Sequence, residues 1–581
     1  MRGFSHQQKE ETMSTEERKG PVAPKDPTRK RPYFYIMQDK QIFAAPQPDG
    51  RGIQFIYEDM GRLPDSAKLQ GNVTDENILN MLTTAEGFRK LVHSIGVSVT
   101  EETRKEEVTF VLQMYGQNQG DPATTVSKRF VADGSEQVID LTDIAWCETD
   151  KVPGQIRFEY DRSGIQSMVD VCLYLNDGYE APEQITDSAI DFESDAYKQM
   201  IHRSIMQKGN LERLHKVTEK AKRGEDVTLS FIGGSITQGA GAIPIHKKCY
   251  ARIYADAFEE KYANGGKVNL IKAGVGGTPS ELGMIRFERD VLRDGKEKPD
   301  LIVIEFAVND EGDETKGVCY ESLVRKCLAL PWKPAVVLLF AVFSYDWNLQ
   351  DRLSPIGERY ELPMVSVLDA VSPQFGLMPG EGRIISKKQF FYDIYHPSNY
   401  GHMVMRDCLM DMTDEADKCT EFAEEGNLLD REPVLGADFE KVYLIDSKDL
   451  SSAEVSVGAF SGTDKMLQMV EMDSEVVPVA EFPNNWYYDG SSDNPVPFRM
   501  KISCKKLLIV NKDSGEHDFG TAEVFVDGRK VLDVDPHVNG WTHCNPLIIL
   551  NGPEASLHEV EVRMTKGDER KKFTILGFGV V

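Results

Sequence analysis

Five short, continuously apolar segments alternate with amphipathic segments from residue 227 onwards, and no other feature of the chain constrains its fold as strongly. They read "VTLSFIG", "KVNLIKAG", "DLIVIEFAV", "AVVLLFAVF" and "PMVSVLDA". Strands that are apolar throughout are buried on both faces, which is typical of a parallel sheet with helices on either side. The sequence therefore predicts an α/β core over residues 227–424, with a parallel sheet at its centre.

The two flanking regions carry a different pattern. In residues 32–185, runs such as "EEVTFVLQMYG" and "QIRFEYD" alternate apolar and polar residues, as half-buried antiparallel strands do. We expect a jelly-roll-like β-sandwich there. Residues 435–581 return to short strands and turns, with an Asp-Gly hairpin signal in "VDGRKV", and predict a C-terminal all-β domain.

Two further segments complete the predicted organisation. Residues 1–31 are polar, mixed in charge and without the apolar run of a secretory signal, so we expect a disordered tail. Residues 186–226 hold an acidic linker followed by apolar residues at helical spacing, which predict one helix over residues 196–223. The chain of 581 residues is long enough for about three domains.

Composition restricts the partners of the chain. A formal net charge of -27 would repel a nucleic-acid backbone or an anionic membrane surface, whereas a neutral sugar or ester is not disfavoured. No apolar stretch is long enough to span a bilayer. We therefore expect no nucleic-acid partner and no membrane partner.

Cysteine and histidine usage adds two expectations. The nine cysteines are dispersed and form no CxxC pair, which favours a reduced, cytoplasmic setting. No cluster of histidine, cysteine or carboxylate residues has metal-ligand spacing, so we expect no metal and no cofactor. The oligomeric state, a homo-oligomer included, is left open.

Polar residues and glycines follow several of the predicted core strands, at the sheet edge where ligands of such folds bind. The first strand ends in "GGS" with Ser235, the second in "AGVGGT" with Gly277, and the third in "AVND" with Asn309. After the last strand, "YDIYHPSNYGH" supplies Asp393 and His396. Because the carboxyl ends of parallel strands share one edge, we expect these residues to converge.

Such a set of residues fits acyl transfer to water. A serine hydroxyl is a weak nucleophile that needs a base, and a histidine oriented by a carboxylate serves as one near neutral pH. The spacing Asp393-x-x-His396 lets both side chains project from one tight turn. The N–H groups of Ser235 and Gly277 and the amide of Asn309 can stabilise an oxyanion.

Each of these residues also has a simpler explanation when it is taken alone. Ser235 could cap a helix, and Gly277 and Asn309 could be turn residues. We expect His402, on the following helix, and Asp310, beside Asn309, to be structural.

The four stretches together resemble the SGNH (GDSL-like) hydrolase family. The family's blocks are similar to "GGSITQG" around Ser235, "AGVGGT" around Gly277, "AVND" around Asn309, and the Asp-x-x-His pair of Asp393 and His396. Two departures are "GGS" in place of Gly-Asp-Ser and an alanine where the third block usually has glycine. The resemblance covers about residues 227–413.

This resemblance implies a flavodoxin-like SGNH core between the two β domains. Ser235 would be the nucleophile, His396 the base and Asp393 its partner. Ser235, Gly277 and Asn309 would form the oxyanion hole.

A narrower resemblance is to bacterial multi-domain carbohydrate acetylesterases, on "RGEDVTLSFIGGSITQGAGA" and "WNLQDRLSPIGERYELPMVSVLDA" between accessory β domains. It implies a serine esterase that removes O-acetyl groups from hemicellulose oligosaccharides, such as xylan, xyloglucan or mannan fragments, through an acetyl-enzyme. The acetylated oligosaccharide would be the partner of the chain.

Several interpretations stay open at this point. Trp541 and His543 in "NGWTHCNP" are candidate substrate contacts, although aromatic residues also fill β-sandwich cores. A thioesterase or lipase could use the same core. A non-catalytic carbohydrate-binding protein could retain the motifs as a relic.

Overall fold

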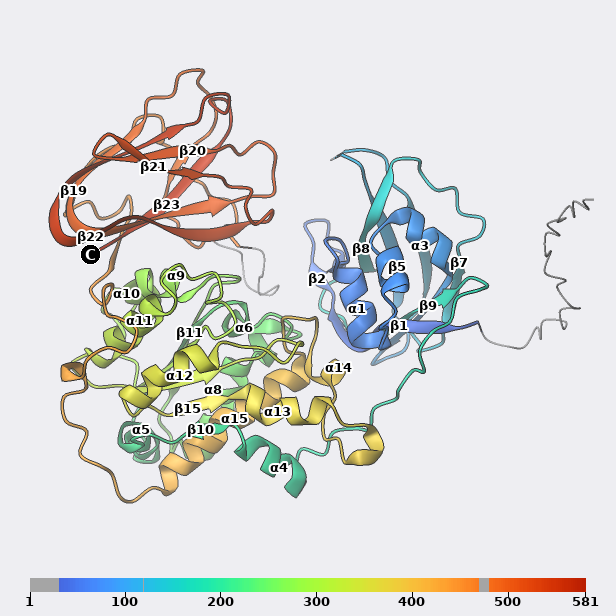
Figure 1. The fold of residues 1–581 in the computed structure, drawn as a ribbon. Coiled ribbons are helices and arrows are strands. Elements are labelled where there is room, and N and C mark those ends of the chain that lie inside the picture. The colour runs from blue at the N-terminus through green and yellow to red at the C-terminus, as the bar shows by residue number, and fades with distance from the viewer. Residues whose placement is uncertain (1–30, 119, 470–479) are drawn as a thin grey trace, which may run out of the picture.

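The computed structural model describes residues 31–118, 120–469 and 480–581, which form an α/β domain with a β domain on each side (Figure 1). The tail predicted over residues 1–31 lies outside the described residues except for Arg31. Among the described helices, none combines the length and the apolar character needed to cross a bilayer.

The N-terminal β domain (residues 31–175) is built from two antiparallel sheets. One sheet has the order β1-β9-β4-β7 and the other the order β2-β3-β8-β5-β6. Their strands are β1 (Tyr33–Phe43), β2 (Ala45–Pro46), β3 (Gly52–Tyr57), β4 (Val92–Glu101), β5 (Glu107–Gly116), β6 (Thr125–Val131), β7 (Gln137–Asp140), β8 (Asp150–Tyr160) and β9 (Gln166–Leu175). Three short helices precede β4, namely α1 (Arg62–Gly71), α2 (Glu76–Met81) and α3 (Ala85–Leu91).

The α/β domain contains a six-stranded sheet of order β10-β15-β14-β13-β11-β12. Its strands are β10 (Ile205–Gln207), β11 (Val227–Gly233), β12 (Val268–Gly274), β13 (Leu301–Glu305), β14 (Ala335–Phe340) and β15 (Met364–Ser366). The five strands from β11 to β15 pair in parallel, and β10 pairs antiparallel with β15 at the edge. The sheet is therefore mixed, with one more strand than the apolar segments predict.

The prediction of a single helix over residues 196–223 is wrong. The segment forms α4 (Asp195–His202), then β10, then α5 (Glu212–Lys222). Gly209 separates β10 from α5 in a left-handed conformation (φ 57°), and a Cβ at this position would lie 2.3 Å from the Glu361 carbonyl oxygen. Apolar residues keep a helical spacing both before and after Gly209. The apolar pattern of the sequence therefore does not reveal the break at this residue.

Helices cover both faces of the sheet, because successive strand residues point to opposite sides. Leu229 and Phe231 of β11 pack with α4, α5, α8 (Tyr250–Tyr262), α13 (Val367–Phe375) and α15 (Asn399–Lys418). Ile302 and Ile304 of β13 pack on the other face with α9 (Ser280–Ile285), α10 (Phe287–Asp290), α11 (Val318–Leu328) and α12 (Gln350–Arg359). The shorter helices α6 (Ser235–Gln238), α7 (Ile245–Lys248) and α14 (Lys387–Phe390) lie in loops of this domain.

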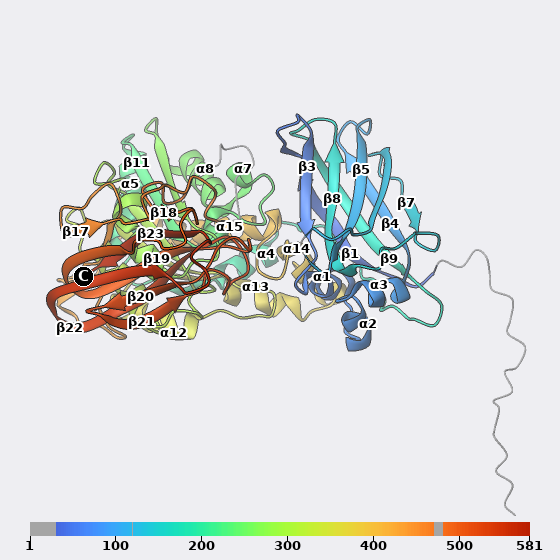
Figure 2. The same ribbon diagram turned by 90° about the horizontal axis from the view of Figure 1, so that it is seen from above.

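The C-terminal β domain (residues 443–580) is one eight-stranded antiparallel assembly. Its strands are β16 (Tyr443–Ile445), β17 (Ala453–Ser456), β18 (Trp486–Tyr488), β19 (Phe498–Asp513), β20 (Ala522–Val526), β21 (Arg529–Val534), β22 (His543–Met564) and β23 (Phe573–Val580). Leu508, Val510 and Leu576 of this domain belong to the same apolar cluster as α9 and α11. Figures 1 and 2 show this domain against the α/β domain, with the N-terminal β domain on another side.

Candidate active site

Ser235 lies where strand β11 passes into α6. The intervening Gly234 leaves no room for a side chain, because a Cβ there would lie 2.2 Å from Oδ1 of Asn309. The N–H of Ser235 is the first of α6 and has no acceptor within that helix, whereas its carbonyl accepts bonds from Gly239 and Ala240 (2.9 Å each). This junction presents a hydroxyl and a backbone donor at the edge of the sheet.

Asp393 and His396 share one tight turn. Oδ1 of Asp393 accepts hydrogen bonds from the backbone N–H groups of Tyr395 and His396, both at 2.8 Å. Oδ2 of the same carboxylate lies 2.9 Å from Nδ1 of His396. The spacing predicts this arrangement, and the carboxylate fixes both the turn and the imidazole.

The hydroxyl of Ser235 lies next to that imidazole. Nε2 of His396 is 3.0 Å from Oγ of Ser235, although 161 positions separate the two residues. The three side chains therefore form a continuous hydrogen-bonded chain from carboxylate to imidazole to hydroxyl.

The Asp393 carboxylate is suited to hold a charged partner. Burial alone would raise its pKa, but the charge of His396 and hydrogen bonds from the turn outweigh burial and lower the pKa of Asp393 to about 2. This carboxyl is ionised at neutral pH and favours the Nδ1–H form of the neutral ring, which leaves Nε2 free to accept the serine proton.

Gly277 and Asn309 follow β12 and β13, the two strands that flank β11. Gly277 has a left-handed backbone (φ 66°), which glycine adopts without strain. Asn309 packs against Gly234, and its Oδ1 is buried with no hydrogen-bond partner among the described residues. Both residues predicted for the oxyanion hole are thus brought to the end of β11.

The domain that carries these residues matches a protein family. Residues 231–404 match the GDSL-like lipase/acylhydrolase family, and the serine, the histidine and its aspartate all fall within that range. This segment is a GDSL-like hydrolase domain. The chain is a carboxylic ester hydrolase.

Two solved structures resemble a larger part of the chain than this domain alone. A two-domain esterase (CEX) active on acetylated mannans shares 26% identity, covering 65% of this chain and 98% of that chain, with a TM-score of 0.55. The same esterase co-crystallised with mannopentaose gives 26% identity, coverage of 65% and 97%, and a TM-score of 0.54. Among curated proteins, none matches the chain.

The C-terminal β domain reaches the hydrolase site at Gly277. Nε2 of His543 lies 2.8 Å from the Gly277 carbonyl oxygen, and a Cβ on Gly277 would lie 2.3 Å from the ring of Trp541. The two rings pack against each other with centroids 4.7 Å apart. Trp541 and His543 are thus beside the predicted site, and His543 holds the backbone of Gly277.

The N-terminal β domain contacts the loop of Asp393 and His396, and the sequence did not predict this contact. A bulge in β1 follows Met37, and Nζ of Lys40 donates to the Tyr392 carbonyl at 3.1 Å and lies 3.9 Å from the centre of that ring. The N–H of Tyr392 in turn donates to the His396 carbonyl at 2.8 Å. Lys40 therefore supports the loop that carries the aspartate and the histidine.

The charge of Lys40 is part of this contact. Burial lowers the pKa of Lys40, while the carboxylates of Glu58 and Asp393 oppose that change. Burial raises the pKa of Glu58 to about 7, and Lys40 acts in the other direction. No sequence motif marks Lys40, because its partner lies in another domain.

A buried carboxyl lies beneath the serine and was also missed. Glu305 ends β13, and its Oε2 accepts a hydrogen bond from Oγ1 of Thr237 in α6 at 3.0 Å. Burial raises the pKa of Glu305 to about 7. The sequence signal that could have revealed Glu305 is a charged residue near the end of the apolar run "LIVIEF". Through Thr237, this residue stabilises the helix that begins at Ser235.

His402 and Asp310 have the structural roles that the sequence predicts. Nδ1 of His402 accepts the N–H of Tyr250, Nε2 lies 3.1 Å from the Ala240 carbonyl oxygen, and burial lowers the pKa of His402 to about 3. Asp310 accepts both the backbone N–H and the hydroxyl of Ser280, at 2.8 Å each, and so anchors the start of α9.

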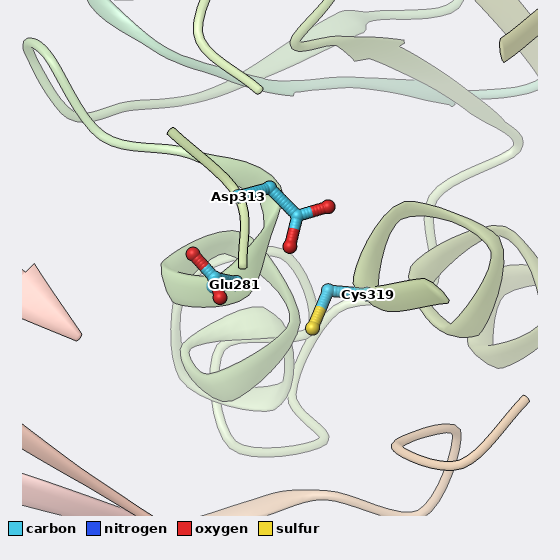
Figure 3. A group of neighbouring side chains, drawn as sticks. All are labelled: Glu281, Asp313 and Cys319. Atoms are coloured by element: carbon cyan, nitrogen blue, oxygen red, sulfur yellow. The ribbon is translucent and has the colours of Figure 1, made fainter. Parts of the chain in front are cut away.

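Three possible metal ligands that are separated in the sequence lie close together in the fold. Figure 3 shows the side chains of Glu281, Asp313 and Cys319 as neighbours. Their ligand atoms all lie within 4.8 Å of one another. The Asp313 carboxylate already accepts bonds from Thr315 and Gly317. Burial and neighbouring carboxylates raise the pKa of Glu281 to about 9, which keeps it protonated at neutral pH. The hydrogen bonds to Asp313 and the proton on Glu281 thus satisfy two of these three groups.

Proposed function

We propose that this chain is a serine esterase that removes O-acetyl groups from carbohydrates, with hemicellulose oligosaccharides such as xylan, xyloglucan or mannan fragments as substrates. The hydrogen-bonded chain from Asp393 through His396 to Ser235 is the observation that carries the proposal. The likeness to an esterase active on acetylated mannans supports the choice of a carbohydrate acetyl ester.

In the first half of the proposed reaction, Oγ of Ser235 attacks the acetyl carbonyl carbon and its proton passes to Nε2 of His396. The N–H groups of Ser235 and Gly277 and the amide of Asn309 stabilise the negative oxygen of the tetrahedral intermediate. The bond to the sugar oxygen then breaks, and that oxygen takes the proton from His396. The products are a free sugar hydroxyl and an acetyl group on Ser235.

In the second half, His396 removes a proton from water as the water oxygen attacks the acetyl-serine. The acetyl–oxygen bond to Ser235 breaks, and Ser235 recovers its proton from His396. Asp393 stays ionised throughout and stabilises the imidazolium.

We also propose a jelly-roll fold for the N-terminal β domain, a flavodoxin-like fold for the core and a cytoplasmic location. The orders β1-β9-β4-β7 and β3-β8-β5-β6 support a jelly roll, and β12-β11-β13-β14-β15 supports a flavodoxin-like core. None of the nine cysteines, all within the described residues, forms a disulfide, which supports a cytoplasmic setting.

The test is acetate release from a panel of acetylated xylan, xyloglucan and mannan oligosaccharides, with p-nitrophenyl acetate as a reference. We expect Ser235→Ala to lower kcat by about 10⁴-fold or more, because no other group can take the acetyl. Ser452→Ala, at an exposed serine of the C-terminal β domain, serves as the control and should leave the rates unchanged.

Three outcomes would contradict the proposal. A rate unaffected by Ser235→Ala would remove Ser235 as the nucleophile. Faster cleavage of long-chain p-nitrophenyl esters or thioesters than of acetate would indicate a lipase or a thioesterase. Sugar binding without hydrolysis of any ester would indicate a binding protein.

A further inference from the structure

Four aromatic side chains gather at the rim of the candidate active site, and the reaction proposed above uses none of them. Phe343, Tyr345 and Trp347 belong to the loop after β14, and Tyr395 lies inside the Asp393–His396 turn. The Phe343 ring is 5.7 Å from Tyr345, 6.0 Å from Trp347 and 5.1 Å from Tyr395, measured between centroids. We call these four residues the aromatic platform.

The platform is open to solvent on one side. Tyr345 is 55% exposed and Tyr395 is 43% exposed, whereas Phe343 and Trp347 are half-buried beneath them. Large aromatic rings clustered at the surface next to a reactive group are characteristic of binding sites rather than of random surface.

The platform is held rigidly against the histidine turn. The N–H of Phe343 donates to the Trp347 carbonyl at 3.1 Å, and the N–H of Ser344 donates to the Ile394 carbonyl at 3.0 Å. Asp346 at the tip of the loop has a left-handed backbone (φ 58°) and forms a 2.8 Å ion pair with Lys387. The loop is therefore built in a fixed position instead of being free to collapse.

The aromatic platform lies close to the reacting atoms. The rings of Tyr395 and His396 have centroids 6.3 Å apart, and Nε2 of His396 contacts the serine. Glu311, two residues after Asn309, contributes to the electrostatic environment of the Tyr345 hydroxyl. The platform thus lies beside the histidine turn and within electrostatic range of Glu311.

Charged groups of the N-terminal β domain lie within electrostatic range of the platform. Asp65 and Arg62 of α1 are among the groups that act on the Tyr395 hydroxyl. An aromatic ring face with a carboxylate and a guanidinium within electrostatic range suits a sugar, which has an apolar C–H face and hydroxyls around its edge.

We propose that the aromatic platform is a sugar-binding subsite, on which a pyranose ring of the acetylated oligosaccharide stacks against Tyr345 and Tyr395 while its acetyl group reaches Ser235. This inference rests on the proposed function and adds the place where the carbohydrate is held. The half-buried Phe343 contacts both exposed rings, and the half-buried Trp347 contacts the ring of Tyr345.

The test compares kcat/KM for the oligosaccharide that the wild-type protein deacetylates fastest with kcat/KM for p-nitrophenyl acetate, which carries no sugar ring. We expect Tyr345→Ala to lower the ratio of the two values by about tenfold, mainly through a higher KM for the oligosaccharide, since exposed tyrosines often dominate binding surfaces. Tyr345→Phe keeps the ring face and should retain the ratio to within about twofold.

The control is Tyr443→Ala, at an exposed tyrosine of β16 outside the site, which should leave the ratio as in the wild type. An unchanged ratio in Tyr345→Ala, in a protein that does deacetylate oligosaccharides, would overturn the platform and leave the proposed function intact. If the wild-type protein cleaved p-nitrophenyl acetate but no acetylated oligosaccharide, the proposed function would fail, and the subsite with it.

Discussion

The C-terminal β domain shares a hydrophobic core with the hydrolase domain, whereas the N-terminal β domain keeps a core of its own. Leu508, Val510 and Leu576 pack in one cluster with α9 and α11. On the N-terminal side, Leu69 packs against the hydrolase core, and polar contacts such as Lys388 with Gln38 (2.7 Å) make the remaining junction. One domain is therefore part of the hydrolase fold, and the other is docked onto it.

The two β domains also contact different parts of the candidate active site. The C-terminal domain touches Gly277, on the side where an oxyanion would be held, through Trp541 and His543. The N-terminal domain touches the acid–base side, through Lys40 and the loop of Asp393 and His396. An accessory domain can thus shape a site either by completing a core or by fixing one loop.

The largest effect is expected from removing each β domain in turn, because one shares the hydrolase core and the other is docked onto it. Removing residues 435–581 would expose buried side chains such as Ile285, which packs on Gly579, and each one costs about 1.5–3 kcal/mol. Several such losses exceed the stability of an ordinary domain, about 5–15 kcal/mol. We expect this truncated protein not to fold, whereas a chain that starts at Ala181 should remain soluble and folded.

Soluble yield, size-exclusion chromatography and thermal melting check this prediction. A folded, active protein without residues 435–581 would contradict the shared core. Aggregation of the chain that starts at Ala181 would contradict the docked character of the N-terminal domain.

A smaller effect is expected on the C-terminal side of the site. Gly277→Ala introduces a Cβ in the left-handed region and against the ring of Trp541, so the N–H of residue 277 must shift. Losing one oxyanion donor costs about 2.7–4 kcal/mol, and we expect kcat to fall by about 10²–10³-fold. Steady-state kinetics with p-nitrophenyl acetate provide the measurement.

Gly265→Ala is the matched control, because Gly265 also has a left-handed backbone (φ 90°) but a Cβ there would meet nothing within 4 Å. It reproduces the backbone strain without the contact. Equal losses of kcat in the two variants would show that strain alone, and not the interface with Trp541, causes the effect.

The smallest effect is expected on the N-terminal side. Lys40→Met removes the cation that donates to the Tyr392 carbonyl, so the histidine turn is less firmly held, and we expect kcat to fall by about tenfold with little change in KM. Because burial lowers the pKa of Lys40, the wild-type lysine loses its proton as the pH rises towards that lowered value. The difference between wild type and variant should therefore narrow at alkaline pH.

Lys151→Met, at an exposed lysine of β8, is the control and should behave as the wild type across the pH range. The chain that starts at Ala181 also lacks Lys40 and should show a similar loss of kcat. A Lys40→Met variant with wild-type kcat at neutral pH would show that the N-terminal domain does not act on the catalytic loop.

The features that could be predicted from the sequence are those encoded in short segments. "GGS", "AVND" and Asp393-x-x-His396 each place a functional group at a strand end or in one turn, and the sheet supplies the common edge. The structure brings Ser235 and His396 within 3.0 Å of each other, as this reasoning predicts.

The features that were missed depend on contacts between segments. Lys40 has no motif, because its role arises from docking of a separate domain. Tyr345 and Tyr395 come from two loops that only the folded chain brings together, and the break at Gly209 depends on the nearby Glu361 carbonyl. Spacing rules describe one element at a time and do not report such encounters.

The Asp393 turn has a consequence for how the enzyme would lose activity on heating. Its carboxylate bonds both the local backbone and the imidazole, so the acid–base pair is assembled by neighbours in the chain. The serine, in contrast, is brought to that pair by the packing of the whole domain. Thermal inactivation should thus begin with a longer distance between Ser235 and His396, while the Asp393–His396 pair is still intact. The kcat that remains at each temperature would then report how closely the fold still holds Ser235 to that pair.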